Sequence, residues 1–183
     1  MDSELYSQLL QKDWLSLAKN IRWVHSIGGE KTGTFRITRG PGWLARQLAR
    51  WSGLPTETDA ADIRLRIIPD APGERWERTF DGLILVTRQW KESDGLLVER
   101  FRDWELSFKL RVQEGNLFYH QSGARLCVGA WRIPMPRACA PRVDAKETAD
   151  GGPHVFVSVT VTLPFVGPLV SYEGLLSVKG VPA

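Results

Sequence analysis

Hydrophobic residues along this chain follow two different spacings, and the change between them comes near residue 62. Residues 4–22 carry hydrophobic side chains at helical intervals with polar residues between them, which predicts an amphipathic helix lying on the rest of the molecule. From residue 62 to 179 the hydrophobic residues mostly recur at every second position, the period of a β-strand with one buried face. We therefore expect a mostly β protein of the α+β class, with helices near its N-terminus.

Residues 23–61 connect these two regions and begin with a glycine-rich loop and a short strand. The segment RGPGWLARQLARWSGLP follows as residues 39–55. Its Pro41 suits a first helical turn and its Gly53 suits a left-handed C-cap, so we predict a short helix over residues 41–52.

The two sides of this short helix differ in character. Leu44, Leu48 and Trp51 fall on one side of a helical wheel, and Ala45 and Ala49 widen this side. We expect the helix to pack as a lid on the sheet through Leu44, Leu48 and Trp51. Trp43 falls among the arginines of the opposite side, where it either covers the helix start or stacks on an arginine. The helix belongs to a binding site only if Trp43 and Arg39 point into a cavity.

Turn sequences divide the remaining chain into strand-length segments. These segments are IRLRIIP, RWERTF, LILVTRQW, LLVERFR, WELSFKLRVQ, NLFYHQS, RLCVGAW, HVFVSVTVTL and LVSYEGLLSV. A long antiparallel meander tends to curl or close so that its edges are hidden, and we therefore predict a barrel or half-barrel. The proline-rich RIPMPRACAPR predicts a surface crossover or rim loop. The final strand either closes the barrel on the first strand or pairs with a second copy.

Arg78, Arg88 and Glu99 stand where the strand pattern requires hydrophobic residues. If the turn is Glu92–Gly95, Arg88 lies directly across from Glu99. A two-residue turn would place the two side chains diagonally, and a one-residue bulge would place them on opposite faces. A charge inside a barrel is costly unless it is paired, so these residues form either a structural ion pair or the polar floor of a ligand cavity.

The three histidines, His25, His120 and His154, lack the spacing of metal ligands. Histidine transfers protons near neutral pH, although a lone histidine is more often structural. We therefore treat His25 as a candidate general base together with Glu99, and His120 as a candidate cavity residue. His154 lies beside a Gly-Gly-Pro turn, where we expect it to be solvated.

Composition indicates one globular domain over residues 1–183, because hydrophobic residues make up 43% and charged residues 25% of the chain. The 24 Lys and Arg against 21 Asp and Glu leave a net charge of only +3. With no dense basic block to follow a phosphate backbone, nucleic-acid binding is not expected. Cys127 and Cys139 lack zinc-ligand spacing, so no metal is expected either.

No hydrophobic run reaches the roughly 20 residues of a membrane-spanning helix, so no membrane span is expected. The first residues, MDSELYSQLL, are acidic and amphipathic, unlike a signal peptide, so we expect a cytoplasmic protein. The sequence also lacks the dinucleotide fingerprint, the phosphate loop and the nucleophile elbow of hydrolases, so no cofactor is expected.

Several motifs in combination resemble a bacterial family named domain of unknown function 4166. They are a histidine followed by GxxxGxFxITRGxGWLARxLARWxGLP, then GERWERTF, ERF, GAWRIPMPRACAPRV with AKE, and LPFVGPLVSYEGLL. The resemblance covers about residues 20–178. Its motif positions in this sequence are His25, Arg39, Gly40, Trp76, Arg78, Glu99, Arg142, Glu147 and Tyr172. The resemblance implies that these residues line a site, and that a dehydrogenase-like protein is a partner, because such domains also occur as the tail of larger proteins with a dehydrogenase-like domain.

Three functions are compatible with these patterns. The first is the binding of an apolar small molecule in the barrel, anchored by Arg88, Glu99 or Arg142. The second is a cofactor-independent enzyme for proton transfer, isomerisation or cyclisation, with His25 or Glu99 as general base and arginines stabilising negative charge. The third is an interaction module whose exposed tryptophans dock a partner protein.

Overall fold

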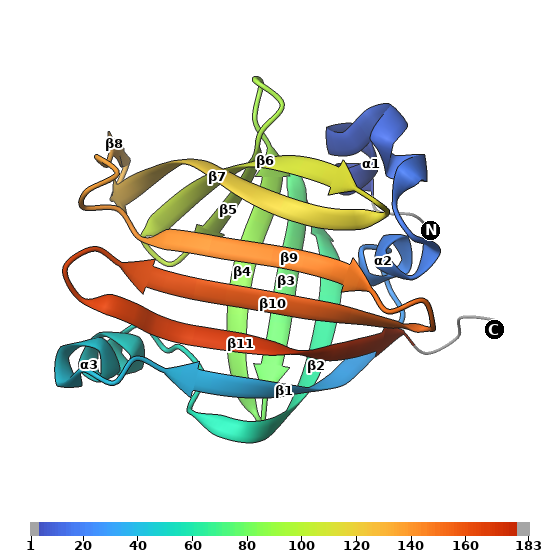
Figure 1. Ribbon diagram of the computed structural model, residues 1–183. Helices are drawn as coiled ribbons and strands as arrows, with labels where there is room; N and C mark the ends of the chain where they lie inside the picture. Colours follow the sequence, from blue (N-terminus) through green and yellow to red (C-terminus); the bar gives the residue numbers. More distant parts are fainter. Residues whose placement is uncertain (1–3, 179–183) are drawn as a thin grey trace.

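Ten antiparallel strands close into a β-barrel in the computed structural model, which describes residues 4–178 (Figure 1). The elements are α1 (Glu4–Leu10), η1 (Gln11–Ser16), α2 (Lys19–Val24), β1 (Lys31–Arg39), α3 (Trp43–Trp51), β2 (Thr58–Asp70), β3 (Gly73–Phe80), β4 (Leu83–Lys91), β5 (Leu97–Phe101), β6 (Trp104–Gln113), β7 (Asn116–Val128), β8 (Trp131–Pro134), β9 (Arg142–Ala149), β10 (His154–Leu163) and β11 (Gly167–Val178). Around the ring the order is β6-β5-β4-β3-β2-β1-β11-β10-β9-β7, and the β6–β7 pairing closes it.

The prediction of a curled antiparallel meander is confirmed, and the ring closes fully. The last strand, β11, pairs along its length with β1, with Phe35 opposite Gly174, so this strand is satisfied within one chain. Residues 1–3 and 179–183 lie outside the described residues, including position 179 of the predicted sheet. Within residues 4–178, no helix has the length and hydrophobicity to cross a membrane.

Strand β9 was not predicted from the sequence. Its outward residues Asp144 and Lys146 are charged, and its inward residues Ala145 and Glu147 show no hydrophobic alternation. The segment RLCVGAW, predicted as a strand of its own, continues β7 and ends on the first residue of β8. The prolines of RIPMPRACAPR keep nearly all of it out of the ring. Strand β8 pairs only with the end of β7, residues 135–141 form a loop, and only Arg142 belongs to a ring strand, β9.

The predicted single N-terminal helix is wrong, because the chain forms three short pieces that cover one end of the barrel (Figure 1). The chain turns at Gln11, where φ is 50°, and again at Leu17, which is extended. A straight helix of this length would run about 28 Å. The breaks instead let each piece bury its own side chains against the barrel, among them Tyr6, Trp14 and Ile21.

Helix α3 forms where it was predicted, and Gly53 follows it with the expected left-handed φ of 63°. The predicted packing face is correct in part: Ala45 and Ala49 are buried and Leu48 packs against the core, whereas Leu44 is 43% and Trp51 76% exposed. The cause is a close backbone approach at Gly40, where a Cβ atom would lie 1.8 Å from the carbonyl oxygen of Pro168. At this separation the alanine side of the helix fits against β11, so that Leu44 and Trp51 turn away from it while Leu48 reaches the cavity.

Strand β6 alternates as predicted over most of its length, with Leu106 and Phe108 inside and Lys109 outside. Glu105 is an exception, because this outward residue is buried. It lies beneath β8 and accepts a hydrogen bond from Nε of Arg132 at 2.8 Å. The short outer strand therefore covers a carboxylate that the alternation alone assigns to water.

Candidate functional site

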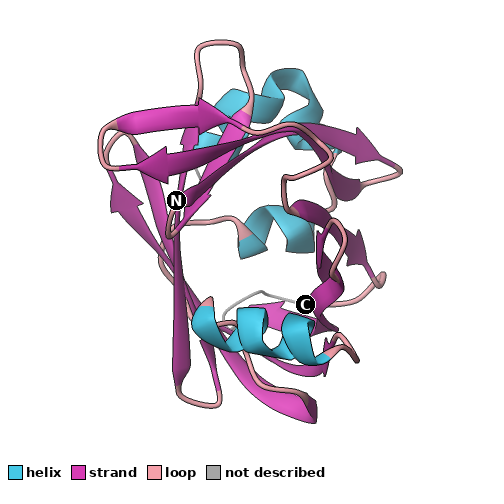
Figure 2. Ribbon diagram, turned by 90° about the vertical axis from the view of Figure 1, so that its left-hand side faces the viewer, coloured by secondary structure: helices cyan, strands magenta, loops and turns pink. Residues whose placement is uncertain are grey.

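A cavity of about 350 Å³ occupies the interior of the barrel. Its wall is mainly aliphatic and aromatic, with valines and leucines of β10 and β11 facing strands β2 to β6. Leu48 and Leu54 close one end beside α3, and Val24 of α2 lies at the other end. Figure 2 looks into the barrel from the α3 end, with α3 across the lower part of the opening and the N-terminal helices behind. The volume falls in the range of small-molecule sites, roughly 300–1,000 Å³.

An ion pair between Arg78 and Glu99 forms the first polar group on the cavity wall. Nη1 and Nη2 of Arg78 donate to Oε1 of Glu99 at 3.3 and 3.2 Å, and Nη1 also donates to Oγ1 of Thr87 at 3.0 Å. The guanidinium lies 5.0 Å from the centre of the Trp76 ring, within cation–π distance. Three neighbouring strands, β3, β4 and β5, therefore supply one rigid polar anchor.

The electrostatics of this anchor follow from its burial. Burial lowers the pKa of Arg78, but the charge of Glu99 and its hydrogen bond, together with Tyr172 and Tyr6, outweigh burial, and the pKa is raised overall. The side chains of Arg78 and Glu99 keep only 14% and 20% exposure. No residue within 4–178 donates a hydrogen bond to Oε2 of Glu99, so this oxygen can accept one from a ligand.

A hydrogen-bonded chain around Glu147 forms the second polar group, at the α2 end of the cavity. Tyr119 donates to Oε1 of Glu147 at 2.9 Å, and Nε2 of His25 lies 2.8 Å from Oε2. The hydroxyl of Tyr6 lies 3.2 Å from that of Tyr119 and donates to Oε1 of Gln89 at 2.9 Å. Burial, followed by the charge of Glu147, raises the pKa of both tyrosines well above the ordinary value. Both phenols are therefore held in the neutral, donating form.

His25 is fully buried behind this chain and does not line the cavity. Its ring lies 3.8 Å from that of Tyr6, centre to centre, and its Nδ1 has no hydrogen-bond partner among the described residues. A carboxylate only accepts hydrogen bonds, so Nε2 donates to Glu147 when that residue is ionised. His25 therefore reaches the cavity only through Glu147.

Five of the residues proposed from the sequence line the cavity. They are Trp76, Arg78, Glu99, Glu147 and Tyr172. Tyr172 lies on β11 with its edge toward Phe80, and burial raises its pKa. Except for Glu147, whose strand was missed, these residues lie on strands that the alternation pattern detects.

Of the three alternatives for the hairpin, the structure has the one that places Arg88 and Glu99 on opposite faces. Arg88 lies opposite Arg100 and Glu99 lies opposite Gln89, a shift of one residue that matches the bulge alternative. The inner face of β4 is therefore the one with Thr87 and Gln89. Arg88 points outward, where its Nε lies 2.9 Å from Oδ2 of Asp70.

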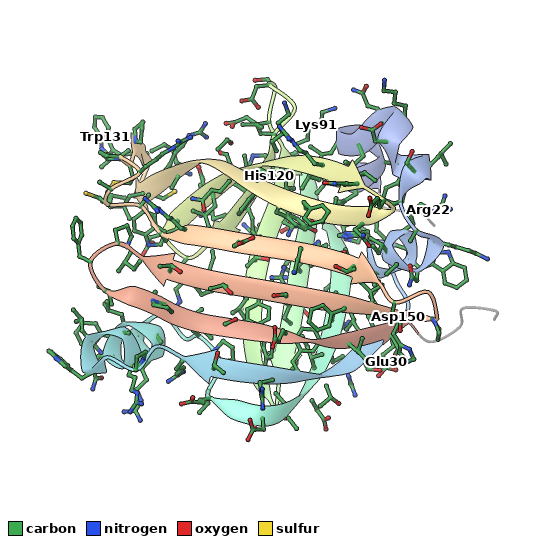
Figure 3. All side chains as sticks on the ribbon, viewed as in Figure 1. Arg22, Glu30, Lys91, His120, Trp131 and Asp150 are labelled. Carbon is green, nitrogen blue, oxygen red and sulfur yellow. The ribbon has the colours of Figure 1, made fainter. Side chains whose placement is uncertain are left out.

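Four further candidates lie outside the cavity. His120 is exposed on the outer surface of β7 (Figure 3), and Arg142 is exposed at the start of β9. Trp43 also points into solvent. Arg39 donates through Nε to the carbonyl of Pro55 at 2.9 Å, so it ties β1 to the chain that leaves α3. Arg39 holds the lid in place, while His120, Arg142 and Trp43 do not line the barrel cavity.

Sequence reasoning missed Tyr6, Thr87, Gln89 and Tyr119. Thr87 and Gln89 were missed because the face of β4 depends on the hairpin register, which the turn sequence left open. Tyr119 and the exposed His120 are consecutive and therefore lie on opposite faces of β7. Assigning the face of Tyr119 to the barrel interior would have identified this residue. No sequence pattern predicted a role for Tyr6, because it lies in an amphipathic segment and its hydrogen-bond partners come from distant strands.

Within residues 4–178, no three His, Cys, Asp or Glu side chains gather in a group that could hold a metal ion. Comparison with known protein families matches residues 17–176 to the family described as Domain of unknown function (DUF4166). No curated protein matches the chain. The match covers most of the barrel and all five cavity-lining candidates, so these residues belong to the part that defines the family.

Proposed function

We propose that this chain, which belongs to the DUF4166 family, binds an apolar small molecule inside its barrel, with Arg78 and Glu99 as the polar anchor. One observation carries the proposal: a cavity of about 350 Å³ with a mainly apolar wall holds a convergent ion pair. Specific small-molecule sites combine a hydrophobic wall with a few placed polar groups. A side-chain-filled core would have used this volume for packing instead.

The charge of the anchor limits the chemistry of the ligand. Because Glu99 already balances Arg78, an anionic ligand would have to displace or compete with an existing partner. A neutral group that both donates and accepts, such as a hydroxyl, can donate to Oε2 of Glu99 without breaking the pair. We therefore expect a mainly hydrocarbon molecule with one neutral polar group.

Filling the cavity tests this proposal. Val159 of β10 lines the cavity, and the neighbouring Ser158 points outward on the same strand. Val159→Trp should abolish binding of the neutral dye N-phenylnaphthylamine, measured by fluorescence, whereas Ser158→Trp should retain it. Equal binding by two folded variants would show that the dye, and by implication the ligand, does not occupy the barrel.

The Glu147 chain supports a second function, a cofactor-independent enzyme that transfers a proton. Glu147 lines the cavity, and His25 and Tyr119 each contact one of its two oxygens. A buried carboxylate held in this way is suited to accept a proton from a bound molecule. His25 would then act through Glu147 as a positioning residue, since it does not touch the cavity.

Deuterium exchange separates the enzyme from the binder. The compound that co-purifies with the protein is returned to the wild type and to Glu147→Gln in heavy water. Incorporation of deuterium with the wild type alone supports proton transfer. A compound that binds to both proteins and takes up deuterium with neither would contradict the proposal of an enzyme. The binding function would then be the one that is supported.

A further inference from the structure

Four aromatic side chains are strongly exposed within residues 4–178, and all lie on segments at one end of the barrel. Trp43, Trp51, Trp131 and Phe165 have exposed fractions between 75% and 95%. The large hydrophobic side chains exposed elsewhere are aliphatic: Leu15, Leu83, Ile84, Val86 and Leu175. Phenylalanine and tryptophan are expensive to leave in water, so their grouping requires an explanation.

Hydrogen bonds between these segments place them next to one another. Arg102, in the β5–β6 turn, donates to the carbonyl of Trp51 at 3.1 Å. The backbone of Asp103 in the same turn accepts from Cys127 at 2.7 Å, which brings in the β7–β8 hairpin. Gly40 donates to Leu169, so the start of α3 adjoins β11 and the turn that precedes it. Figure 1 shows α3, β8 and the β10–β11 turn at the same end, and Figure 3 shows Trp131 at the outer tip.

This is also the end at which the cavity lies beneath α3. Leu48 and Ser52 of the α3 region, Leu163 at the end of β10 and Leu169 of β11 line the cavity here. The opposite end carries the buried Tyr6, Ile21 and other side chains of the N-terminal helices. The exposed aromatic residues therefore surround the α3 end of the cavity and not its plugged end.

Arginines accompany the aromatic residues. We define the collar as residues 40–57, 102–103, 128–141 and 164–166. It contains five arginines, Arg46, Arg50, Arg102, Arg132 and Arg137, and two acidic residues, Glu57 and Asp103. Of these arginines only Arg132 forms an ion pair within the described chain, with Glu105. The collar is thus basic, and most of its charge is unpaired.

We propose that the collar docks on a bilayer containing anionic phospholipids. Tryptophan and phenylalanine anchor proteins in the interfacial layer, and arginine binds phosphate headgroups. A stable protein partner would require one contiguous packed patch of roughly 800 Å². The collar instead carries separate aromatic tips on a helix, a hairpin and a turn around an opening, which a fluid headgroup layer accommodates. Docking would place the cavity end against the apolar part of the membrane.

Vesicle flotation of the full chain tests the aromatic part of the collar. The wild type should float with vesicles of phosphatidylcholine and phosphatidylglycerol and much less with phosphatidylcholine alone. The triple variant Trp51→Ala, Trp131→Ala and Phe165→Ala should lose at least about 10-fold in partitioning for each aromatic residue that enters the interface. The control Leu15→Ala with Ile84→Ala removes exposed aliphatic residues elsewhere and should bind as the wild type does.

A charge series provides an independent test. Arg46→Gln with Arg50→Gln should lower partitioning to anionic vesicles about 25-fold, since each arginine near the surface contributes about 5-fold. The matched pair Lys109→Gln with Arg111→Gln, exposed on β6, should leave it unchanged. Circular dichroism and thermal unfolding establish that each variant is folded, which the exposure of these residues favours.

Three results would overturn the proposal. The first is a wild type that floats with neither vesicle, or equally with both. The second is partitioning that follows the control pairs instead of the collar variants. The third is a wild type that forms a dimer without binding vesicles and whose dimer is broken by the aromatic triple variant, because a second copy would then be the occupant of this surface.

Discussion

The ion pair between Arg78 and Glu99 allows a quantitative prediction. Replacing Glu99 with leucine leaves the guanidinium of Arg78 with Oγ1 of Thr87 as its remaining hydrogen-bond partner within residues 4–178. Breaking a fully buried pair costs roughly 3–5 kcal/mol. This pair keeps 14% and 20% exposure toward the cavity, so we expect a smaller cost of about 2–3 kcal/mol in the free energy of unfolding. Arg78→Met should cost a similar amount, because it leaves the carboxylate unpaired.

The double variant distinguishes a lost ion pair from lost packing. With both charges gone, Arg78→Met with Glu99→Leu should lose about 1 kcal/mol or less, which gives a coupling energy of at least about 3 kcal/mol. Urea unfolding of the four proteins measures it. The exposed pair Arg88 and Asp70 is the control, with an expected coupling of at most about 1 kcal/mol. Strictly additive losses at Arg78 and Glu99 would refute the reasoning.

Two further predictions concern Lys31 and Gly40. Burial lowers the pKa of Lys31 to about 8 from 10.5, so the unfolded chain binds more protons than the folded one between these values, and stability rises with pH there. The free energy of unfolding of the wild type, relative to that of Lys31→Met, should therefore rise by up to about 3 kcal/mol from pH 8 to 10.5. A difference between the two proteins that does not change with pH would contradict the lowered pKa of Lys31. Gly40→Ala should destabilise by about 1–3 kcal/mol because its Cβ meets Pro168. Gly42→Ala, with nothing within 4 Å, should change thermal stability little; equal effects would contradict the close approach.

Alternation along the strands was enough to predict the barrel, since burying one face of each strand is a local property of the sequence. It failed at β9, where the inward Glu147 is stabilised by Tyr119 and His25 from distant elements. It also failed at β4, because a shift of one residue in the hairpin exchanges the two faces. Local periodicity therefore predicts which segments are strands, but not which face of a hairpin strand is inside.

In the candidate site, too, residues with a local sequence pattern were predicted and residues positioned by distant contacts were not. Arg78 and Glu99 were predicted because a charge among hydrophobic residues is visible in the sequence, whereas Trp76 was identified only through the family motifs. The exposure of Leu44 and Trp51 on α3 was not predicted, because the approach of Gly40 to Pro168 leaves room there only for small residues. No local pattern encodes a contact across 128 residues of chain. The exposed Trp51 is consequently a surface residue of the collar and not part of the core.

Native mass spectrometry of the purified protein tests the central proposal most directly. The wild type and Ser158→Trp should carry a mass increment from an apolar small molecule that is released on unfolding. Val159→Trp, whose new side chain fills the cavity, should carry none. An increment of equal size and occupancy on folded Val159→Trp, or a wild type that carries no increment and binds no neutral dye, would contradict ligand binding inside the barrel.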